Sequence, residues 1–247
     1  MTCRINIRQK IYDIDWEEAI DISQSFGPGG ANPRAFHLPA ADHRPVQVGD
    51  FIGSVKGGGS ANCDFITFCA HGNGTHTECF GHITAGQESI NRYYPKGFLL
   101  AQLLTVSPEQ RQNDWVITRK CIEDKISKGI DAIMLRTDLD GIVIGNHWSG
   151  SNPPYFEPEA LAYLSQIGVN HLLTDLPSVD REDDGGQLSA HKVWWNMKGD
   201  IRSHATITEM IYVSRSIEDG PYILQIHVAP IESDAAPSRP IIFKLKN

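Results

Sequence analysis

Three histidines and a glutamate fall within twelve residues, in the segment His71-Gly-Asn-Gly-Thr-His76-Thr-Glu78-Cys-Phe-Gly-His82. Histidine is the commonest metal ligand in proteins, and carboxylate oxygens complete many sites for hard or borderline divalent ions. His76 and Glu78 are two residues apart, so on an extended strand their side chains point to the same face. One short strand could therefore supply two ligands to one ion, and the segment predicts a metal-dependent enzyme.

A histidine-rich surface loop without chemistry is the simplest alternative. It would explain the composition of the segment, but it would not explain why His76 and Glu78 alternate with other residues. Histidines that occur singly are usually hydrogen-bonded structural residues, and we interpret the scattered ones in this way. These are His37, His43, His147, His171 and His227.

A metal site normally takes ligands from more than one segment, and two distant residues are the best candidates. His191 lies in Ser-Ala-His-Lys-Val-Trp-Trp, whose aromatic residues predict partial burial. Glu209 lies in the apolar, strand-like run Ala-Thr-Ile-Thr-Glu-Met-Ile-Tyr-Val, where a carboxylate is costly unless it is paired or coordinated. His204 competes with His191, but Arg-Ser-His is more typical of an exposed turn.

Other reactive patterns are weaker. Cys79 lies inside the histidine segment and could act as a nucleophile, although a free cysteine is more often inert packing. The three glycines 57–59 are not followed by the Lys-Ser/Thr of a phosphate loop, and the chain has no Gly-x-Ser-x-Gly elbow.

Composition sets the class of protein. The 247 residues are 40% hydrophobic and 21% charged, which is ordinary for a soluble globular protein, and we expect a single domain over residues 1–247. A net charge of −8 argues against a nucleic acid partner. The sequence has neither an apolar run long enough to cross a membrane nor the apolar start of a signal peptide. Five cysteines without a Cys-x-x-Cys pair favour a reducing compartment, so we expect a cytoplasmic protein.

The pattern of apolar residues predicts an α/β fold with a mixed sheet. Residues 25–47 are expected to form a long loop and 54–62 a flexible connector. Helices are predicted over 118–129 and 158–168, where Thr118 and Pro158 are start signals and Gly129 and Gly168 are end signals. Strands are predicted over 64–69, 98–106, 131–136, 169–175, 206–213, 222–229 and 240–245.

The histidine segment resembles the motif of the cyclase superfamily, which includes kynurenine formamidase and isatin hydrolase. That motif is His-x-Gly-Thr-His-x-Asp-x-Pro-x-His, and Gly74-Thr75-His76 and His82 match it here. Further similarities follow in the family's order between residues 19 and 213. They are Asp21-Ile-Ser23, Met134-Leu-Arg-Thr137 with Trp148, Asp175-Leu-Pro-Ser-Val-Asp180, Ala190-His191 and Ile207-Thr-Glu209.

The resemblance implies a swivelling β/β/α fold, a homodimer or homotetramer, and hydrolysis of an amide or lactam-like C–N bond of a small molecule. It implies one or two divalent ions, Zn²⁺ or Mn²⁺, bound by His71, His76, Glu78, His191 and Glu209. It also makes His82 and Glu209 the catalytic residues, with His82 as a proton carrier that is not a ligand.

Three departures from the family motif affect the site. His71 lies five residues before His76, whereas the family has four and Gly72 occupies that position. Glu78 replaces the family's aspartate, which lengthens the side chain by one methylene, and Phe80 replaces the proline.

Two other functions use the same residues. His76, Glu78 and His191 also fit the two-histidine, one-carboxylate site of non-haem iron oxygenases, which is usually carried by all-β proteins. A metal-binding protein without catalytic activity is the third possibility. The order of matching segments favours the hydrolase.

Overall fold

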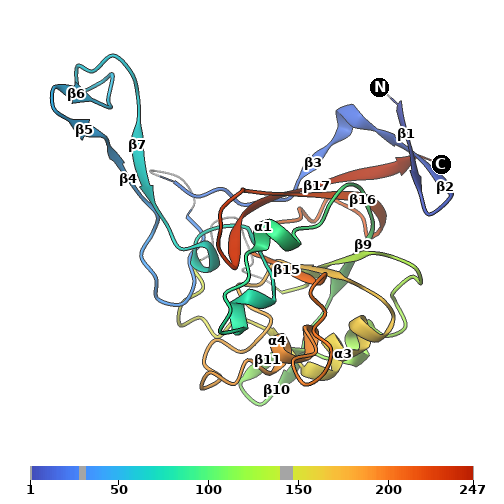
Figure 1. The fold of residues 1–247 in the computed structure, drawn as a ribbon. Coiled ribbons are helices and arrows are strands. Elements are labelled where there is room, and N and C mark those ends of the chain that lie inside the picture. The colour runs from blue at the N-terminus through green and yellow to red at the C-terminus, as the bar shows by residue number, and fades with distance from the viewer. Residues whose placement is uncertain (1, 28–31, 140–146, 247) are drawn as a thin grey trace.

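Seven strands close into a mixed β-barrel in the computed structural model, which describes residues 2–27, 32–139 and 147–246 (Figure 1). Around the barrel they are β17 (Ala235–Lys246), β16 (Gly220–Val228), β9 (Leu99–Val106), β12 (Ala132–Thr137), β14 (His171–Thr174), β15 (Thr206–Glu209) and β8 (His76–Glu78), and β8 pairs again with β17. The run from β9 to β15 is parallel, and the other neighbours are antiparallel. The expected mixed sheet is confirmed, and it closes on itself.

The remaining elements are short. The helices are α1 (Ile90–Tyr93), α2 (Arg119–Ile122), α3 (Pro158–Gln166) and α4 (Ser189–Trp194), with 3-10 turns η1 (Trp16–Glu18), η2 (Ala70–Gly72) and η3 (Phe80–Ile83). The other strands are β1 (Thr2–Ile7), β2 (Lys10–Asp15), β3 (Ile20–Asp21), β4 (Asp42–Pro45), β5 (Gln47–Val48), β6 (Phe51–Ile52), β7 (Asp64–Thr67), β10 (Glu109–Arg111), β11 (Asp114–Ile117) and β13 (Tyr155–Phe156). None of the helices in the described part of the chain has the length and apolar character that a membrane crossing requires.

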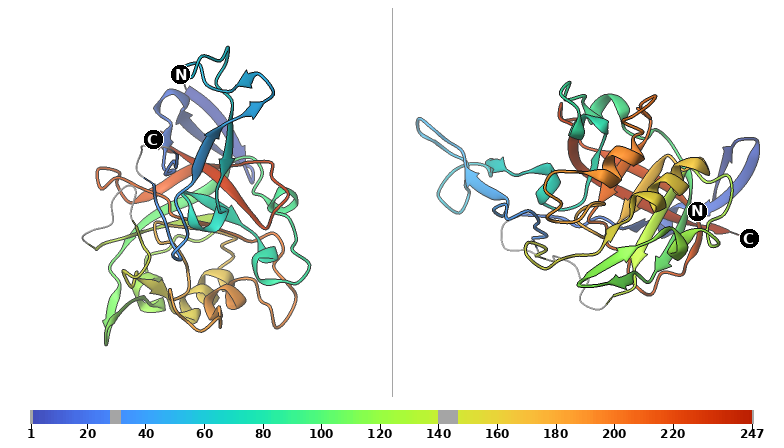
Figure 2. Two further views of the ribbon diagram at one scale, coloured as in Figure 1. Left: turned by 90° about the vertical axis from the view of Figure 1, so that its left-hand side faces the viewer. Right: turned by 90° about the horizontal axis from the view of Figure 1, so that it is seen from below.

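Both faces of the central strands are buried, as parallel strands with near-continuous apolar sequence require. Along β12, Met134 lies in the cluster that fills the barrel, whereas Ile133 and Leu135 lie in the cluster between the barrel and the helices. The helices α3 and α4 pack against each other on that outer side (Figures 1 and 2). The outer face of the barrel is therefore a covered surface on which buried side chains can be held.

The prediction of a helix over 158–168 is confirmed, but the one over 118–129 is wrong in length. Only Arg119–Ile122 is helical. The Gln102 side chain on β9 accepts from Ser127 N at 2.8 Å and donates to the Lys125 carbonyl at 2.8 Å. These backbone groups therefore bond to a side chain of the barrel instead of extending the helix, and tertiary structure overrides local propensity.

The prediction that residues 64–69 form a strand is confirmed in type, but the strand ends at Thr67 and lies outside the core. All four residues of β7 are exposed, because β7 pairs only with β4. Together with β5 and β6 they form an arm, residues 42–67, that projects from the barrel (Figure 1). The last residues of the loop predicted over 25–47 belong to this arm and not to a loop. An N-terminal hairpin of β1 and β2, which the sequence analysis did not predict, extends the sheet beyond β17.

His171 on β14 should make the protein sensitive to acid. Its side chain is buried, with Nδ1 3.0 Å from Thr206 Oγ1, and burial lowers the pKa of His171 to about 4. Between pH 4 and 6.5 the unfolded chain binds a proton here that the folded chain does not. The free energy of unfolding therefore decreases as the pH is lowered through this range. We expect a loss of about 2 kcal/mol between pH 7 and pH 5 from this group.

Urea denaturation at pH 7 and pH 5 measures this change in the free energy of unfolding. His171→Gln should lose that part of the pH dependence, whereas the same change at the exposed His227 should keep it. Identical pH dependence in wild type and His171→Gln would show that His171 does not contribute.

Candidate metal centre

His76 and Glu78 lie on the outer face of β8, towards the helices. The residue between them, Thr77, points the other way, with Oγ1 2.8 Å from both Thr208 Oγ1 and Ser238 Oγ. In the register of β8 with β15, His76 lies opposite Glu209. The predicted alternation of His76 and Glu78 is therefore confirmed, and the antiparallel pairing brings the distant Glu209 beside them.

His71 reaches the same place although one extra residue separates it from His76. It lies in the 3-10 turn η2, and Gly74 returns the chain to β8 with a φ of +77°. A Cβ atom on Gly74 would lie 2.5 Å from the Phe26 ring and 2.9 Å from the Gln24 carbonyl oxygen. Only glycine fits this turn without strain, and the turn accommodates the additional residue.

Five predicted ligands converge. Nδ1 of His71 lies 3.1 Å from Oε2 of Glu78, and Nε2 of His191 lies 3.2 Å from its Oε1. Nε2 of His76 lies 3.3 Å from Oε2 of Glu209. Ligands at zinc-binding distance on a tetrahedral ion are about 3.3 Å from one another. The spacing of these atoms is therefore that of ligands around an ion.

Three atoms at the centre of the cluster lack hydrogen-bond partners among the described residues. They are Nε2 of His76 and both carboxylate oxygens of Glu78, and all three are buried. The closest groups to the Glu78 oxygens are the ring nitrogens of His71 and His191, which make ion-pair contacts with them. A buried carboxylate without hydrogen bonds is costly, unless a cation binds it. The donor set of imidazole nitrogens and carboxylate oxygens fits a divalent first-row metal.

Each of the three histidines is fixed through its other ring nitrogen. Nε2 of His71 lies 2.6 Å from Oδ2 of Asp234, and Nδ1 of His191 lies 2.5 Å from Oδ2 of Asp180. Nδ1 of His76 lies 3.1 Å from the backbone carbonyl oxygen two residues earlier. Asp180 also accepts from the backbone N–H groups of Ala190 and His191, at the start of α4. Such outer partners orient the metal-facing nitrogen and are typical of metal-binding histidines.

The charges of the cluster favour protonated imidazoles. Burial alone would lower the pKa of His71, but the carboxylates of Asp234 and Glu78 raise it to about 10. Asp180 and Glu78 likewise raise the pKa of His191 to about 10 against the effect of burial. Burial alone would raise the pKa of Glu78, but the neighbouring imidazoles hold it well below its usual range. A metal ion must therefore compete with protons for His71 and His191.

Zinc binding at pH 7 should release about two protons per chain, because both histidines are protonated there and a ligand nitrogen must be free. The apparent affinity should accordingly rise as the pH increases from 7 towards 10. Titration calorimetry in buffers of different ionisation enthalpy measures the released protons. His204→Ala is the matched control, since His204 is exposed and contacts Asn170 instead of the cluster. A binding enthalpy that is the same in every buffer would contradict the expectation.

His82 occupies a different position from the ligands. It lies in η3, and a ring nitrogen is within 4.8 Å of ligand atoms of Glu78 and His191. Its side chain is 28% exposed, whereas those of His76 and Glu78 are almost completely buried. Nδ1 of His82 lies 3.4 Å from Oδ2 of Asp234. His82 is therefore a partly exposed imidazole at the edge of the cluster, beside His71, whose side chain is 21% exposed.

The outer partners were not predicted from the sequence. Asp180 belonged to the Asp-x-Pro-Ser-x-Asp segment, but its contact with His191 depends on the loop before α4. No pattern in the sequence pointed to Asp234. Its position follows from the pairing of β17 with β8, which places the next residue, Ala235, opposite Glu78.

Several other candidates lie outside the cluster. Cys79 is buried and its Sγ lies 3.1 Å from the Glu88 carbonyl oxygen, and burial raises the pKa of Cys79 to about 12, which argues against a nucleophile. The two tryptophans that follow His191, Trp194 and Trp195, are fully buried, and the Trp195 ring centroid is 5.6 Å from that of His191.

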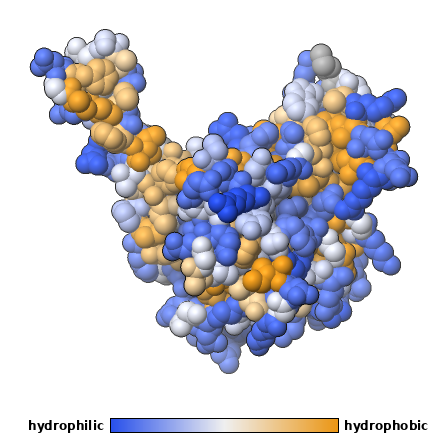
Figure 3. Space-filling view, viewed as in Figure 1, coloured by the Kyte–Doolittle hydropathy of each residue, from blue (hydrophilic) through white to orange (hydrophobic). Residues whose placement is uncertain are grey.

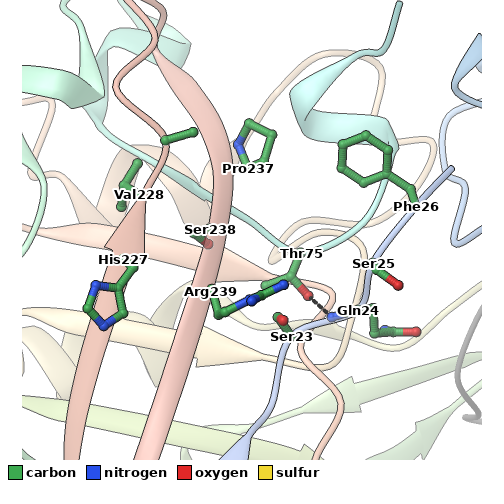
Figure 4. Close-up of a pocket in the computed structure, with 11 residues that line it drawn as sticks. Ser23, Gln24, Ser25, Phe26, Thr75, His227, Val228, Pro237, Ser238 and Arg239 are labelled. Carbon is green, nitrogen blue, oxygen red and sulfur yellow. Dashed lines mark hydrogen bonds between the residues drawn. The ribbon is translucent and has the colours of Figure 1, made fainter. Parts of the chain in front are cut away.

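A cavity of about 420 Å³ lies elsewhere, between the segment after β3 and the strands β16 and β17. Figure 4 shows Arg239, Ser23 and Thr75 on its wall, with the Gln24 backbone N–H donating to Thr75 Oγ1 at 2.7 Å. None of the five predicted ligands lines it. The metal cluster and this cavity are separate features.

Comparisons with known proteins agree with the geometry. The chain is 25% identical over 191 residues to the kynurenine formamidase of Bacillus mycoides (strain KBAB4), covering 76% of this chain and 83% of that protein. The structure of a predicted metal-dependent hydrolase from Bacillus stearothermophilus matches with a TM-score of 0.62 at 18% identity, covering 92% of this chain and 98% of that one. Isatin hydrolase A from Ralstonia solanacearum matches with a TM-score of 0.66 at 15% identity, covering 92% and 91%.

At these identities the solved structures show only a shared fold. The assignment to a family depends on the match of the sequence to a family model. Residues 20–181 match the family model described as "Putative cyclase". The matched region contains the histidine segment and extends to the Asp-x-Pro-Ser-x-Asp segment. Since the model spans more than half of the sequence, the chain belongs to the cyclase family.

Proposed function

We propose that this protein is a metal-dependent hydrolase that cleaves the C–N bond of an aryl formamide or a cyclic amide. The observation that carries the proposal is the convergence of buried ligand atoms of His76 and Glu78, which lack hydrogen bonds among the described residues, beside the partly exposed imidazole of His82. The names of the relatives, a kynurenine formamidase and an isatin hydrolase, support the substrate class.

His71, His76, Glu78, His191 and Glu209 would hold one or two divalent ions, zinc or manganese. Bound there, such an ion would supply activation of water and polarisation of a carbonyl oxygen. The two oxygens of Glu78 face different histidines, His71 and His191, so this residue has the geometry to serve two positions. Glu209 is held by the Val179 backbone N–H, which donates to Oε1 at 3.1 Å and leaves Oε2 beside His76.

His82 is the group placed to move protons. It lies on the accessible edge of the cluster, where it could take a proton from the attacking water and deliver it to the nitrogen that leaves as the C–N bond breaks. Its neighbour Asp234 is a carboxylate, which stabilises the protonated imidazole between these two steps.

The test is hydrolysis of a panel of aryl formamides, lactams and cyclic imides by zinc- and manganese-loaded protein under anaerobic conditions. We expect turnover of at least one class, loss after chelation, and recovery when metal is restored. Oxygen consumption that depends on iron, without anaerobic hydrolysis, would favour the oxygenase and contradict the proposal. Tight metal binding with no activity on any substrate would favour a non-catalytic protein.

We also propose that the protein acts in the cytoplasm as a homodimer or homotetramer. The five cysteines are all free, which fits a reducing compartment. The projecting arm carries exposed apolar side chains, including Phe65 and Ile66 at 57% and 54% (Figure 3). A two-stranded hairpin is only marginally stable alone, and a second copy of the chain would cover this surface.

Light scattering after size-exclusion chromatography tests the assembly. Wild-type protein should be a dimer or tetramer, and the double substitution Phe65→Ser with Ile66→Ser should shift it towards monomer with the metal content unchanged. Ile201→Ser, at an exposed apolar residue outside the arm, is the control. Monomeric wild type at micromolar concentration would contradict the proposal.

A further inference from the structure

Asp234 contacts two histidines with the same oxygen atom. Its Oδ2 lies 2.6 Å from Nε2 of His71 and 3.4 Å from Nδ1 of His82. The two imidazole rings lie side by side, with centroids 4.1 Å apart and planes inclined by 34°. One carboxylate therefore connects a metal-ligand candidate with the proposed proton carrier.

Asp234 lies close enough to His71 and His82 to share an ion with them, but the distances favour it as an outer partner. Its contact with His71, at 2.6 Å, is a direct hydrogen bond, whereas neighbouring ligands of a tetrahedral zinc are about 3.3 Å apart. The same difference separates the two contacts of His191, 2.5 Å to Asp180 and 3.2 Å to Glu78. Asp234 thus belongs with Asp180 as an outer partner.

The backbone fixes Asp234 firmly beside the cluster. Its carbonyl oxygen accepts from Cys79 N at 3.0 Å, and the next residue pairs with Glu78 in the β17–β8 ladder. On the preceding residue, the Ser233 carbonyl oxygen accepts from Ile90 N at 2.7 Å, and Ser233 Oγ donates to Asp234 Oδ1 at 3.2 Å. The carboxylate is therefore held at a defined point between the rings.

We propose that Asp234 is a positioning residue that serves both histidines. It accepts the Nε2–H of His71, which leaves Nδ1 as the metal-facing atom of this displaced ligand. It also orients His82 through Nδ1, so that Nε2 is the atom left to exchange protons with the reactants. The 3.4 Å contact is an ion-pair contact, and catalytic hydrogen bonds often shorten only when substrate binds. The inference rests on the proposed function and adds a residue to its machinery.

Asp180 provides a matched comparison, because its carboxylate orients His191 and makes no hydrogen bond or ion pair with His82. Both Asp234→Asn and Asp180→Asn should weaken zinc binding by about 10- to 100-fold, the usual effect of an outer partner. Zinc affinity is measured by competition with a chelating dye, which requires no substrate. At saturating zinc the two variants should differ.

With the metal site filled, Asp180→Asn should recover most of its kcat. Asp234→Asn should stay at least about tenfold slow, with KM little changed, because His82 has lost its partner. In a His82→Ala background the same substitution should cause little further loss, since residues that act as a unit are not additive. Asp234→Glu keeps the carboxylate and should recover part of kcat. This recovery would show that the loss in Asp234→Asn comes from the missing carboxylate and not from misfolding.

Three results would overturn the inference. They are unchanged zinc affinity and kcat in Asp234→Asn, loss of a zinc equivalent even at saturation, which would make Asp234 a ligand, and equal slowness of Asp180→Asn at saturating zinc. Failure of the wild type to bind either zinc or manganese would instead remove the proposed function, so the two failures are distinguishable.

Discussion

Glu78→Ala should empty the metal site and abolish hydrolysis. Glu78 faces His71 with one oxygen and His191 with the other, so its removal takes a ligand from every position the cluster offers. We expect metal affinity to fall by more than the roughly 10- to 100-fold typical for the loss of an outer partner. Elemental analysis of the purified variant measures the metal content directly.

Glu88→Ala is the matched control for Glu78→Ala. Glu88 is a nearby carboxylate whose side chain accepts from Thr84 Oγ1 and takes no part in the cluster. It should keep its metal and its activity. Glu78→Gln preserves the size of the buried side chain and should lose metal like the alanine variant. Undiminished metal content in both Glu78 variants would remove this residue from the ligand set.

His82→Ala should keep the metal but lose most turnover, by about a hundredfold to ten-thousandfold in kcat. The expectation follows from its place, since His82 is partly exposed at the edge of the cluster while His76, Glu78 and His191 are buried. Steady-state kinetics at saturating metal, together with elemental analysis, separate the two effects. His204→Ala changes an exposed histidine outside the cluster and should be neutral. Full activity of metal-loaded His82→Ala would exclude it as the proton carrier.

Local patterns predicted those parts of the molecule that depend on local sequence. The apolar run of β9 and the proline and glycine around α3 fixed elements that the structure confirms. The alternation of His76 and Glu78 predicted their common face on β8. Such features depend on the regular spacing of side chains along a helix or strand, and this spacing can be read from the sequence.

Long-range contacts account for what was missed. The helix expected over 118–129 is shortened by Gln102, a side chain from another strand. The strand β7 was predicted as a strand, but nothing in its residues shows that it pairs only with β4. Asp234 reaches the site because β17 closes the barrel against β8, a pairing between segments more than 150 residues apart.

The site residues themselves were found through the family pattern as much as through chemistry. His191 and Glu209 lie far from the histidine segment, and the order of matching segments along the chain supported the choice that their apolar and aromatic neighbours had suggested. The structure brings both to Glu78 and His76. It also accommodates the extra residue after His71 through the turn at Gly74, a solution that depends on space beside Phe26.

A crystal structure of the untreated protein, with anomalous diffraction data at the absorption edges of zinc, manganese and iron, tests the central claim most directly. We expect an anomalous peak within about 2.0–2.2 Å of Nδ1 of His71, Nε2 of His76 and an oxygen of Glu78, with Nε2 of His71 on Asp234. A second peak beside His191 would show that Glu78 serves two ions. An ordered cluster without any anomalous peak, in protein that elemental analysis also finds free of metal, would contradict the assignment of a metal-dependent hydrolase.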